Sequence, residues 1–159
     1  MNKYFKIKNK ENGFTLFISI VIMGTVLLIA TGVISLAVKQ AFISSAGKES
    51  QNAFYAADTG VECALFWDIH NPSGVSAFST STTSSIYCNN DVNNSSNQWT
   101  VGGGYTSTIN YISFNPDPYC AVVTVTKSVG GGTTIESKGY NTCDSSNPRR
   151  AEKAVRAVY

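Results

Sequence analysis

The sequence predicts an α+β fold in which one long N-terminal helix packs on a small antiparallel sheet. Three features predict this fold. The chain has an uncharged apolar run from Phe14 to Val38, and apolar residues then recur at helical spacing up to about residue 70. Alternating or β-branched segments follow after Gln98. We expect the first half of the helix to cross a membrane and the second half to be amphipathic.

The apolar run from Phe14 to Val38 is long enough to cross a bilayer. As a helix its 25 residues would extend roughly 37 Å, beyond the ~30 Å hydrocarbon core. The apolar region of a secretory signal peptide is shorter, at about 7–15 residues. Four lysines precede the run: Lys3, Lys6, Lys8 and Lys10. By the positive-inside rule, the N-terminus stays in the cytoplasm and the rest of the chain is exported.

The charge of the exported part gives little support for nucleic-acid binding. Residues 1–13 hold four of the twelve basic residues and one of the ten acidic ones, which leaves a net charge of −1 for the rest. Proteins that bind nucleic acid take most of their affinity from clustered Lys and Arg. The one dense basic group is Arg149, Arg150, Lys153 and Arg156, which we interpret as a solvated face.

The four cysteines predict disulfides rather than a metal site. They are Cys63, Cys88, Cys120 and Cys143, without a Cys-x-x-Cys pair and with a single histidine in the chain. An even number of cysteines in a small exported domain indicates two bridges, for which three connectivities are possible. A hairpin across the glycines at 130–132 would place Cys120 opposite a residue near 141–143. This favours Cys120–Cys143 and Cys63–Cys88.

The helix is predicted to continue beyond the membrane run. Its second part, residues 39–70, carries an apolar stripe at three- and four-residue spacing: Phe54, Ala57, Val61, Ala64 and Leu65. We expect one continuous or gently bent helix from about Phe14 to about Trp67. The segment Asn71-Pro72-Ser73-Gly74 would end it in a turn.

Residues 71–159 are predicted to form a small β domain. The Ser/Thr/Asn-rich segment 73–98 is expected to be a surface loop with one short strand near Ile86 and Tyr87. Later strands are expected at 106–114, with Ile109, Tyr111 and Ser113 on one face, and at 121–125 and 133–140, giving a sheet of three or four strands. The apolar spacing in 151–159 fits a helix.

No arrangement of residues typical of an enzyme is present. The single histidine and the absence of Gly-x-Ser-x-Gly exclude a Ser/His/Asp triad. The triple glycines at 102–104 and 130–132 lack the Gly-Lys-Ser/Thr ending of a phosphate-binding loop and are expected to be turns. Asp58 and Glu62 have a spacing that suits a metal or an ion pair, and we favour solvated or ion-paired carboxylates. We therefore expect no catalytic residue, no metal and no cofactor.

Two motifs carry a resemblance to a known family. The segment Lys10-Glu11-Asn12-Gly13-Phe14-Thr15-Leu16, followed by the apolar run, resembles the processing site of type IV prepilins, a family that includes type II secretion pseudopilins. The segment from Gln51 to Glu62 resembles the Ala-Phe-x-Ala-Ala-Glu pattern of PilX-type minor pilins. In that family a prepilin peptidase cuts after the glycine and methylates the new N-terminal Phe. The resemblance implies cleavage between Gly13 and Phe14 and a leader at 1–13.

The resemblance also implies an architecture, partners and a location. A C-terminal strand at 151–159 is favoured over the helix that the spacing suggests. Expected partners are other pilin subunits through helix–helix contacts, the prepilin peptidase, an inner-membrane assembly platform, and membrane lipid before assembly. The chain would lie first in the cell membrane and then in an extracellular pilus or a periplasmic pseudopilus.

One departure from the family pattern concerns Ile18. Major pilins carry Glu at the fifth mature position, where the carboxylate is thought to pair with the N-terminal amine of an adjacent subunit. Ile18 occupies that position here, which predicts a minor or tip subunit rather than the bulk fibre protein. Two alternatives stay open: a pseudopilin of a type II secretion system, and a single-pass membrane protein whose exported domain binds a ligand without polymerising.

Overall fold

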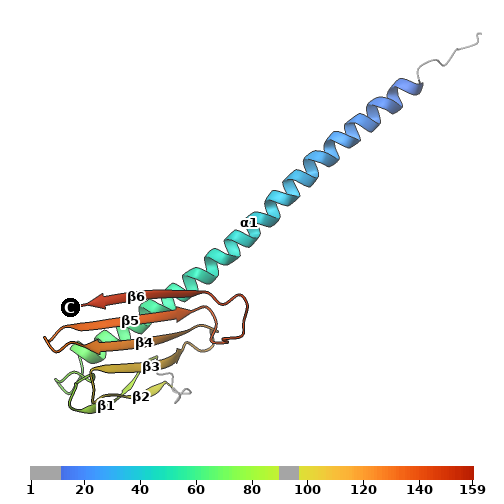
Figure 1. The fold of residues 1–159 in the computed structure, drawn as a ribbon. Coiled ribbons are helices and arrows are strands. Elements are labelled where there is room, and N and C mark those ends of the chain that lie inside the picture. Colours follow the sequence, from blue (N-terminus) through green and yellow to red (C-terminus); the bar gives the residue numbers. More distant parts are fainter. Residues whose placement is uncertain (1–11, 90–96) are drawn as a thin grey trace, which may run out of the picture. The chain divides into compact units, whose positions relative to one another are not determined.

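The computed structural model describes residues 12–89 and 97–159, which form one long helix and six strands (Figure 1). The elements are α1 (Asn12–Ile69), β1 (Thr83–Tyr87), β2 (Gln98–Gly102), β3 (Thr106–Ser113), β4 (Cys120–Lys127), β5 (Thr133–Tyr140) and β6 (Glu152–Val158). The predicted α+β class is confirmed. The lysines at 3–10 lie outside the described residues.

The chain divides into two compact units, one ending at Ser45 and the other running from Ala46 to Tyr159. Helix α1 contributes to both units. In the first unit, every described side chain of α1 from Gly13 onward is exposed. In the second unit, the part of α1 after Ala46 packs on the sheet, so the core of the fold lies entirely in this unit.

Helix α1 ends where the sequence predicts. No proline interrupts it, and Asn71-Pro72-Ser73-Gly74 follows as a turn. The N–H of Gly74 donates to the Asn71 carbonyl at 2.9 Å, and the Asn71 side-chain amide donates to the Val75 carbonyl at 2.7 Å. Gly74 has a φ of 73°, a left-handed conformation that glycine adopts without strain.

The main sheet has four antiparallel strands in the order β3-β4-β5-β6 (Figure 1). Strands β4 and β5 form the predicted hairpin, with Cys120 opposite Tyr140 and Lys127 opposite Thr133. Strand β6 pairs with β5, so residues 151–159 contain a strand and not a helix. Strands β1 and β2 form a separate two-stranded sheet, which is linked to β3 by a hydrogen bond of 2.9 Å from Trp99 Nε1 to the Asn110 carbonyl.

Helix α1 approaches the sheet through its smallest side chains. Ala53, Ala57 and Ala64 are fully buried against it. A Cβ atom added at Gly139 of β5 would overlap the Ala53 carbonyl oxygen and lie 2.9 Å from the Ala57 Cα atom. The predicted apolar stripe is therefore wrong at Phe54, which is 46% exposed, because nothing larger than alanine fits where the two backbones approach.

Two further expectations for the β domain are wrong. A β-bulge lies between Ile109 and Ile112, and both of these isoleucines are buried. The extra residue in the bulge turns Tyr111 to the opposite face, where it is 51% exposed, so Ile109 and Tyr111 do not share a face. The segment 73–98 is not wholly a surface loop, because Ala77 and Phe78 are buried in the core.

The close approach at Gly139 predicts that the substitution Gly139→Ala destabilises the domain. The added methyl group must push α1 away from β5, at a cost of about 1–3 kcal/mol in the free energy of unfolding. Denaturant unfolding of the full chain in detergent, followed by tryptophan fluorescence, measures this loss. Gly104→Ala is the matched control, since a Cβ there meets nothing within 4 Å. Equal stability of the two variants would contradict the packing argument.

Candidate functional site

The residues of the predicted processing site lie at the beginning of α1. Gly13 and Phe14 are in its first turn, and Phe14 is 71% exposed. A Cβ atom at Gly13 would have no neighbour within 4 Å. Ile18 lies one turn further along and is 40% exposed. No acidic residue occurs between Gly13 and Lys48, so this part of the helix offers no carboxylate to a partner.

Helix α1 is long and apolar enough to cross a membrane, beginning at Gly13. Three hydroxyl groups in this region donate to carbonyl oxygens of the preceding turn, each at 2.9 Å: Ser19 to Thr15, Thr25 to Ile22, and Thr31 to Leu28. An unsatisfied polar group is costly in hydrocarbon, and these bonds satisfy the hydroxyls within the helix itself.

A disulfide joins the second half of α1 to the end of β1. It links Cys63 to Cys88, one of the two pairings favoured by the sequence. Trp67 lies one turn beyond Cys63, and its Nε1 donates to the Tyr87 carbonyl at 2.9 Å, while the Trp67 and Tyr87 rings meet edge to face at 5.1 Å. The bridge and the indole together hold β1 against the helix.

The other two cysteines are free thiols in this structure. Cys120 is buried at the start of β4, and Cys143 lies in the loop after β5. Burial, and then a hydrogen bond with Cys143, raise the pKa of the Cys120 thiol to about 12. The two side chains are in contact, and the Cys120–Cys143 bridge is not formed here.

A buried carboxylate, Asp68, connects the last turn of α1 to three other segments. Its side chain is 3% exposed. Lys127 Nζ donates to both carboxylate oxygens, at 2.6 and 2.7 Å, and to Thr133 Oγ1 at 2.8 Å. The hydroxyls of Ser76 and Tyr159 also donate to Asp68. This Asp68 cluster was not predicted. The one feature of the sequence that could have indicated the cluster is the position of Asp68 among the aromatic and apolar residues of the last helical turn.

Two opposing effects act on the pKa of Asp68. Burial, the largest, would raise the pKa, because the charged form loses hydration. The hydrogen bonds from Lys127, Ser76 and Tyr159 favour the charged form and outweigh burial, so the pKa lies below its usual value. Burial, and then the hydrogen bond to Asp68, raise the pKa of the Tyr159 hydroxyl. The cluster therefore carries a carboxylate at neutral pH.

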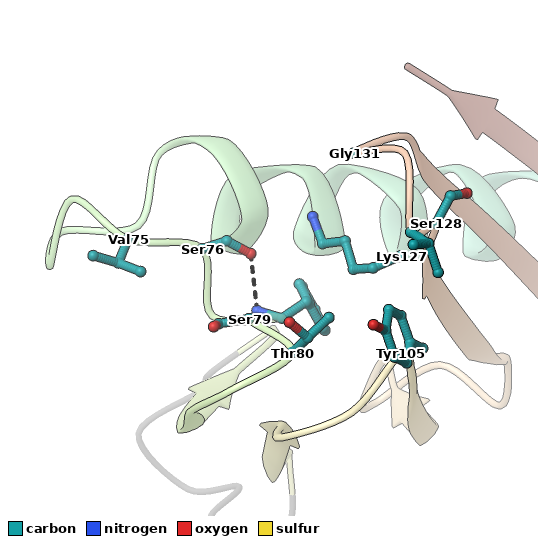
Figure 2. A pocket seen from close by; sticks show the side chains of 10 residues that line it. Val75, Ser76, Ser79, Thr80, Tyr105, Lys127, Ser128 and Gly131 are labelled. Carbon is teal, nitrogen blue, oxygen red and sulfur yellow. Dashed lines mark hydrogen bonds between the residues drawn. The ribbon is translucent and has the colours of Figure 1, made fainter.

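A hydroxyl-lined hollow of 370 Å³ lies beside the Asp68 cluster (Figure 2). Tyr105 faces Ser79 and Thr80 across it, and Ser76 accepts a hydrogen bond from the Phe78 N–H at 3.0 Å. Lys127 is the one cation among the residues that line the hollow, and Asp68 already neutralises it. The hollow therefore offers no free positive charge to an anionic ligand.

A second polar contact ties the other end of the packed helix to the loop that contains Cys143. Asn141 is buried, and its side-chain amide donates to the Glu49 carboxylate at 2.7 Å and to the Arg149 carbonyl at 3.1 Å. Its Oδ1 accepts from the Ala151 N–H at 2.6 Å. This contact was not predicted, and no local pattern in the sequence indicates it.

The remaining candidate residues do not form a reactive site. Asp58 and Glu62 are exposed on α1, and the described residues contain no group of three or more side chains suited to bind a metal. Arg150, from the predicted basic group, stacks over the Tyr140 ring at 3.8 Å.

The Asp68 cluster predicts that Lys127→Met destabilises the domain strongly. Removing one partner of a buried ion pair leaves an unpaired charge, at a cost of about 3–5 kcal/mol. Denaturant unfolding of the full chain in detergent measures the loss. Lys138→Met removes an exposed ion pair and is the control, with an expected change below about 1 kcal/mol.

The double variant Asp68→Asn, Lys127→Met identifies the cause of the loss. Recovery of stability in this variant would assign the loss to the unpaired carboxylate. A double variant as unstable as Lys127→Met would contradict it.

The pH dependence of stability provides a second measurement on the same cluster. The folded pKa of Asp68 is depressed, so its stabilisation is complete above the unfolded pKa of about 3.9 and is lost as the pH falls through the folded value. Below about pH 4, wild type should therefore lose stability more steeply than the double variant.

The comparison with known families agrees with this geometry. The model of the PilX N-terminal family matches residues 12–62, the stretch that contains Phe14, Ile18 and the start of the packed helix. No curated protein and no solved structure matches the chain. The family is structural and non-enzymatic, and its members act with the other components of the pilus. Residues 12–62 are thus similar to the PilX N-terminal domain, which characterises a family of type IV minor pilins.

Proposed function

We propose that the chain is made as a prepilin, cut between Gly13 and Phe14, methylated on Phe14, and assembled as a minor subunit at the tip of the filament. Residues 1–13 would be the discarded leader, residues 14–38 the membrane span, 39–70 its amphipathic continuation and 71–159 the exported domain. The four leader lysines support a cytoplasmic N-terminus. The filament then replaces the membrane as the surroundings of α1.

The observation that carries the processing step is the environment of Gly13. Glycine within a helix costs about 1 kcal/mol relative to alanine. A Cβ at Gly13 would meet nothing within 4 Å, and no left-handed φ requires glycine there. The packing of the fold therefore does not require glycine at position 13. Recognition by a peptidase would explain why glycine occurs there.

Assembly would exchange lipid contacts of α1 for contacts with neighbouring helices. Little hydrophobic driving force separates these two environments, so close packing decides the exchange. Gly24 and Gly32 suit such packing, because a Cβ at either position meets nothing within 4 Å and both leave the helix backbone open to a neighbour. We infer that other pilin subunits dock along this part of α1, delivered by an inner-membrane assembly platform.

The tip position is supported by Ile18. A subunit inside a filament would leave the N-terminal amine of an adjacent subunit without its carboxylate partner, and an unpaired charge in an apolar core is costly. A subunit with nothing docked ahead of it avoids this cost. The absence of any acidic residue from Gly13 to Lys48 means that no neighbouring side chain of α1 substitutes for the missing glutamate.

We further propose that Cys120 and Cys143 form the second disulfide after export. Their thiols already contact each other, and the Cys143 N–H donates to the Pro118 carbonyl at 3.0 Å, which fixes the loop beside β4. A disulfide donor of the exported compartment would be reduced to two thiols as the two protein thiols lose their hydrogens. The closed loop of 23 residues would add roughly 3–4 kcal/mol of stability in the chain-entropy estimate.

Intact-mass analysis of the protein purified from cells tests the processing and the bridges together. We expect a mature chain that begins at Phe14, is one methyl group heavier than the unmodified sequence, and lacks four hydrogen atoms because of two disulfides. Gly13→Ala should abolish cleavage, and Gly24→Ala is the matched control that should be cut normally. An unprocessed chain in assembled filaments would refute the processing step, whereas two remaining thiols would refute the second bridge alone.

Quantitative mass spectrometry of sheared filaments tests the tip assignment. A tip subunit should be present at far below the amount of the major pilin, and its ratio to that pilin should fall as the filaments become longer. Ile18→Glu supplies the missing carboxylate and should allow incorporation along the shaft, raising this ratio. A wild-type amount equal to that of the most plentiful pilin would refute the assignment.

A further inference from the structure

The face of the main sheet that α1 does not cover carries a groove of 470 Å³, here called the outer groove. It runs across β3, β4 and β5, and its volume lies within the range of about 300–1,000 Å³ typical of ligand sites. The residues that matter to its chemistry are Asn110, Tyr111, Thr124, Glu136, Lys138 and Tyr140. No role in the fold or in filament assembly has been assigned to these side chains.

A β-bulge in β3 supplies one wall of the outer groove. Ile109 is opposite Val123 and Ile112 is opposite Ala121, so two residues, Asn110 and Tyr111, lie between paired positions. In a regular strand one of these two side chains would point into the core. The bulge turns both to the outer face, where both are exposed.

Tyr111 adopts a backbone conformation that tyrosine rarely takes. Its φ is 53°, in the left-handed region that favours glycine. Strained residues of this kind persist where the surrounding structure holds them, and they cluster at ligand sites. The core needs the bulge to bury Ile112, but it does not need a large aromatic residue at the strained position.

The charges of the outer groove are balanced. Lys138 lies 4.0 Å from Glu136 and 3.8 Å from Glu152, and all three side chains are about half exposed. The groove therefore has no net positive charge for phosphate or acidic polymers. It offers donors and acceptors in fixed positions, since an amide such as Asn110 provides both.

The aromatic residues of the groove are positioned for stacking. Tyr111 is 51% exposed, and Tyr140 is held from another side by the Arg150 guanidinium at 3.8 Å from its ring centre. Burial, and then a hydrogen bond with Glu152, raise the pKa of the Tyr140 hydroxyl. The Tyr140 ring, which Arg150 holds in place, and the exposed Tyr111 ring thus lie beside a row of threonine hydroxyls.

These groups suit a saccharide. The C–H faces of sugar rings pack on aromatic rings, and sugar hydroxyls bond to amides, carboxylates and other hydroxyls.

We propose that the outer groove binds a neutral saccharide, with Tyr111 stacking on a sugar ring and Asn110 bonding to its hydroxyls. The balanced charge favours a neutral glycan over an acidic one, and the groove volume suits one or two sugar rings rather than a protein surface. A protein interface would require a larger patch, with charged residues depleted at its centre. This inference does not depend on processing or on the tip position.

Titration of the full chain with neutral oligosaccharides tests the proposal. The protein is kept in lauryldimethylamine oxide micelles, because this detergent has no sugar headgroup, and cellohexaose, chitohexaose and maltohexaose are added separately in calorimetry. At least one should bind saturably. Tyr111→Ala should weaken that binding about tenfold, the loss expected for one aromatic contact. Tyr105→Ala removes an equally exposed tyrosine outside the groove and should bind as wild type does.

A second variant separates binding from folding. Tyr111→Gly removes the ring and also relieves the strain at a φ of 53°, so its melting temperature should equal or exceed that of wild type while saccharide binding falls. Loss of binding together with a fall in melting temperature would mean that Tyr111 serves the fold, which overturns the role assigned to it.

Other outcomes would also overturn the proposal. One is the absence of binding by all three oligosaccharides at concentrations of about 10 mM, beyond the range of weak specific affinities. Tighter binding of an oligogalacturonate would show that the ligand is acidic. Equal loss in Tyr105→Ala would move binding to the other hollow. A change of oligomeric state in Tyr111→Ala, measured by sedimentation, would show that a second copy of the chain covers this face.

Discussion

The close approach of α1 to β5 is the constraint on which the rest of this structure depends. At Gly139 the sheet has no side chain, and the helix backbone at Ala53 and Ala57 lies directly against it. A seam made of alanine and glycine leaves no room for large residues between helix and sheet. The large apolar residues of this part of α1 are therefore turned outward, so that Phe54 and Tyr55 remain exposed. In the proposed filament, these exposed residues would contact other subunits.

The small residues between α1 and β5 have no large side chains that interlock, so they do not fix the position of the helix along the sheet. Polar contacts fix this position. Glu49 is held by Asn141 near one end of the packed segment, and Asp68 is held by Lys127 at the other. The Cys63–Cys88 bridge lies between them. Each contact has its own geometry, and a shift of the helix by one turn would break all three. Buried polar groups of this kind add little net stability but specify one arrangement.

How far the sequence determines these features depends on whether their cause is local. The length of α1, its end at Asn71 and the hairpin from β4 to β5 follow from local apolar spacing and turn residues, and all three were predicted. The exposure of Phe54 was not predicted, because this exposure depends on the close approach at Gly139, which is far away in the chain. The spacing of 151–159 indicated a helix, whereas the family resemblance favoured a strand, and the segment pairs with the open edge of β5 as that strand. Asp68 and Asn141 were missed because their partners come from other elements.

The bulge in β3 explains why two consecutive side chains lie on the outer face of the sheet. The core requires Ile109 and Ile112 on the inner face, and a regular strand separates such residues by an even number of positions. Their separation of three forces a bulge, and the two residues between them must both face outward. The fold thus dictates that positions 110 and 111 are exposed but leaves their side chains free. Asparagine and a strained tyrosine at these positions lie on the face away from α1, and the ligand proposed for the outer groove would give them a role.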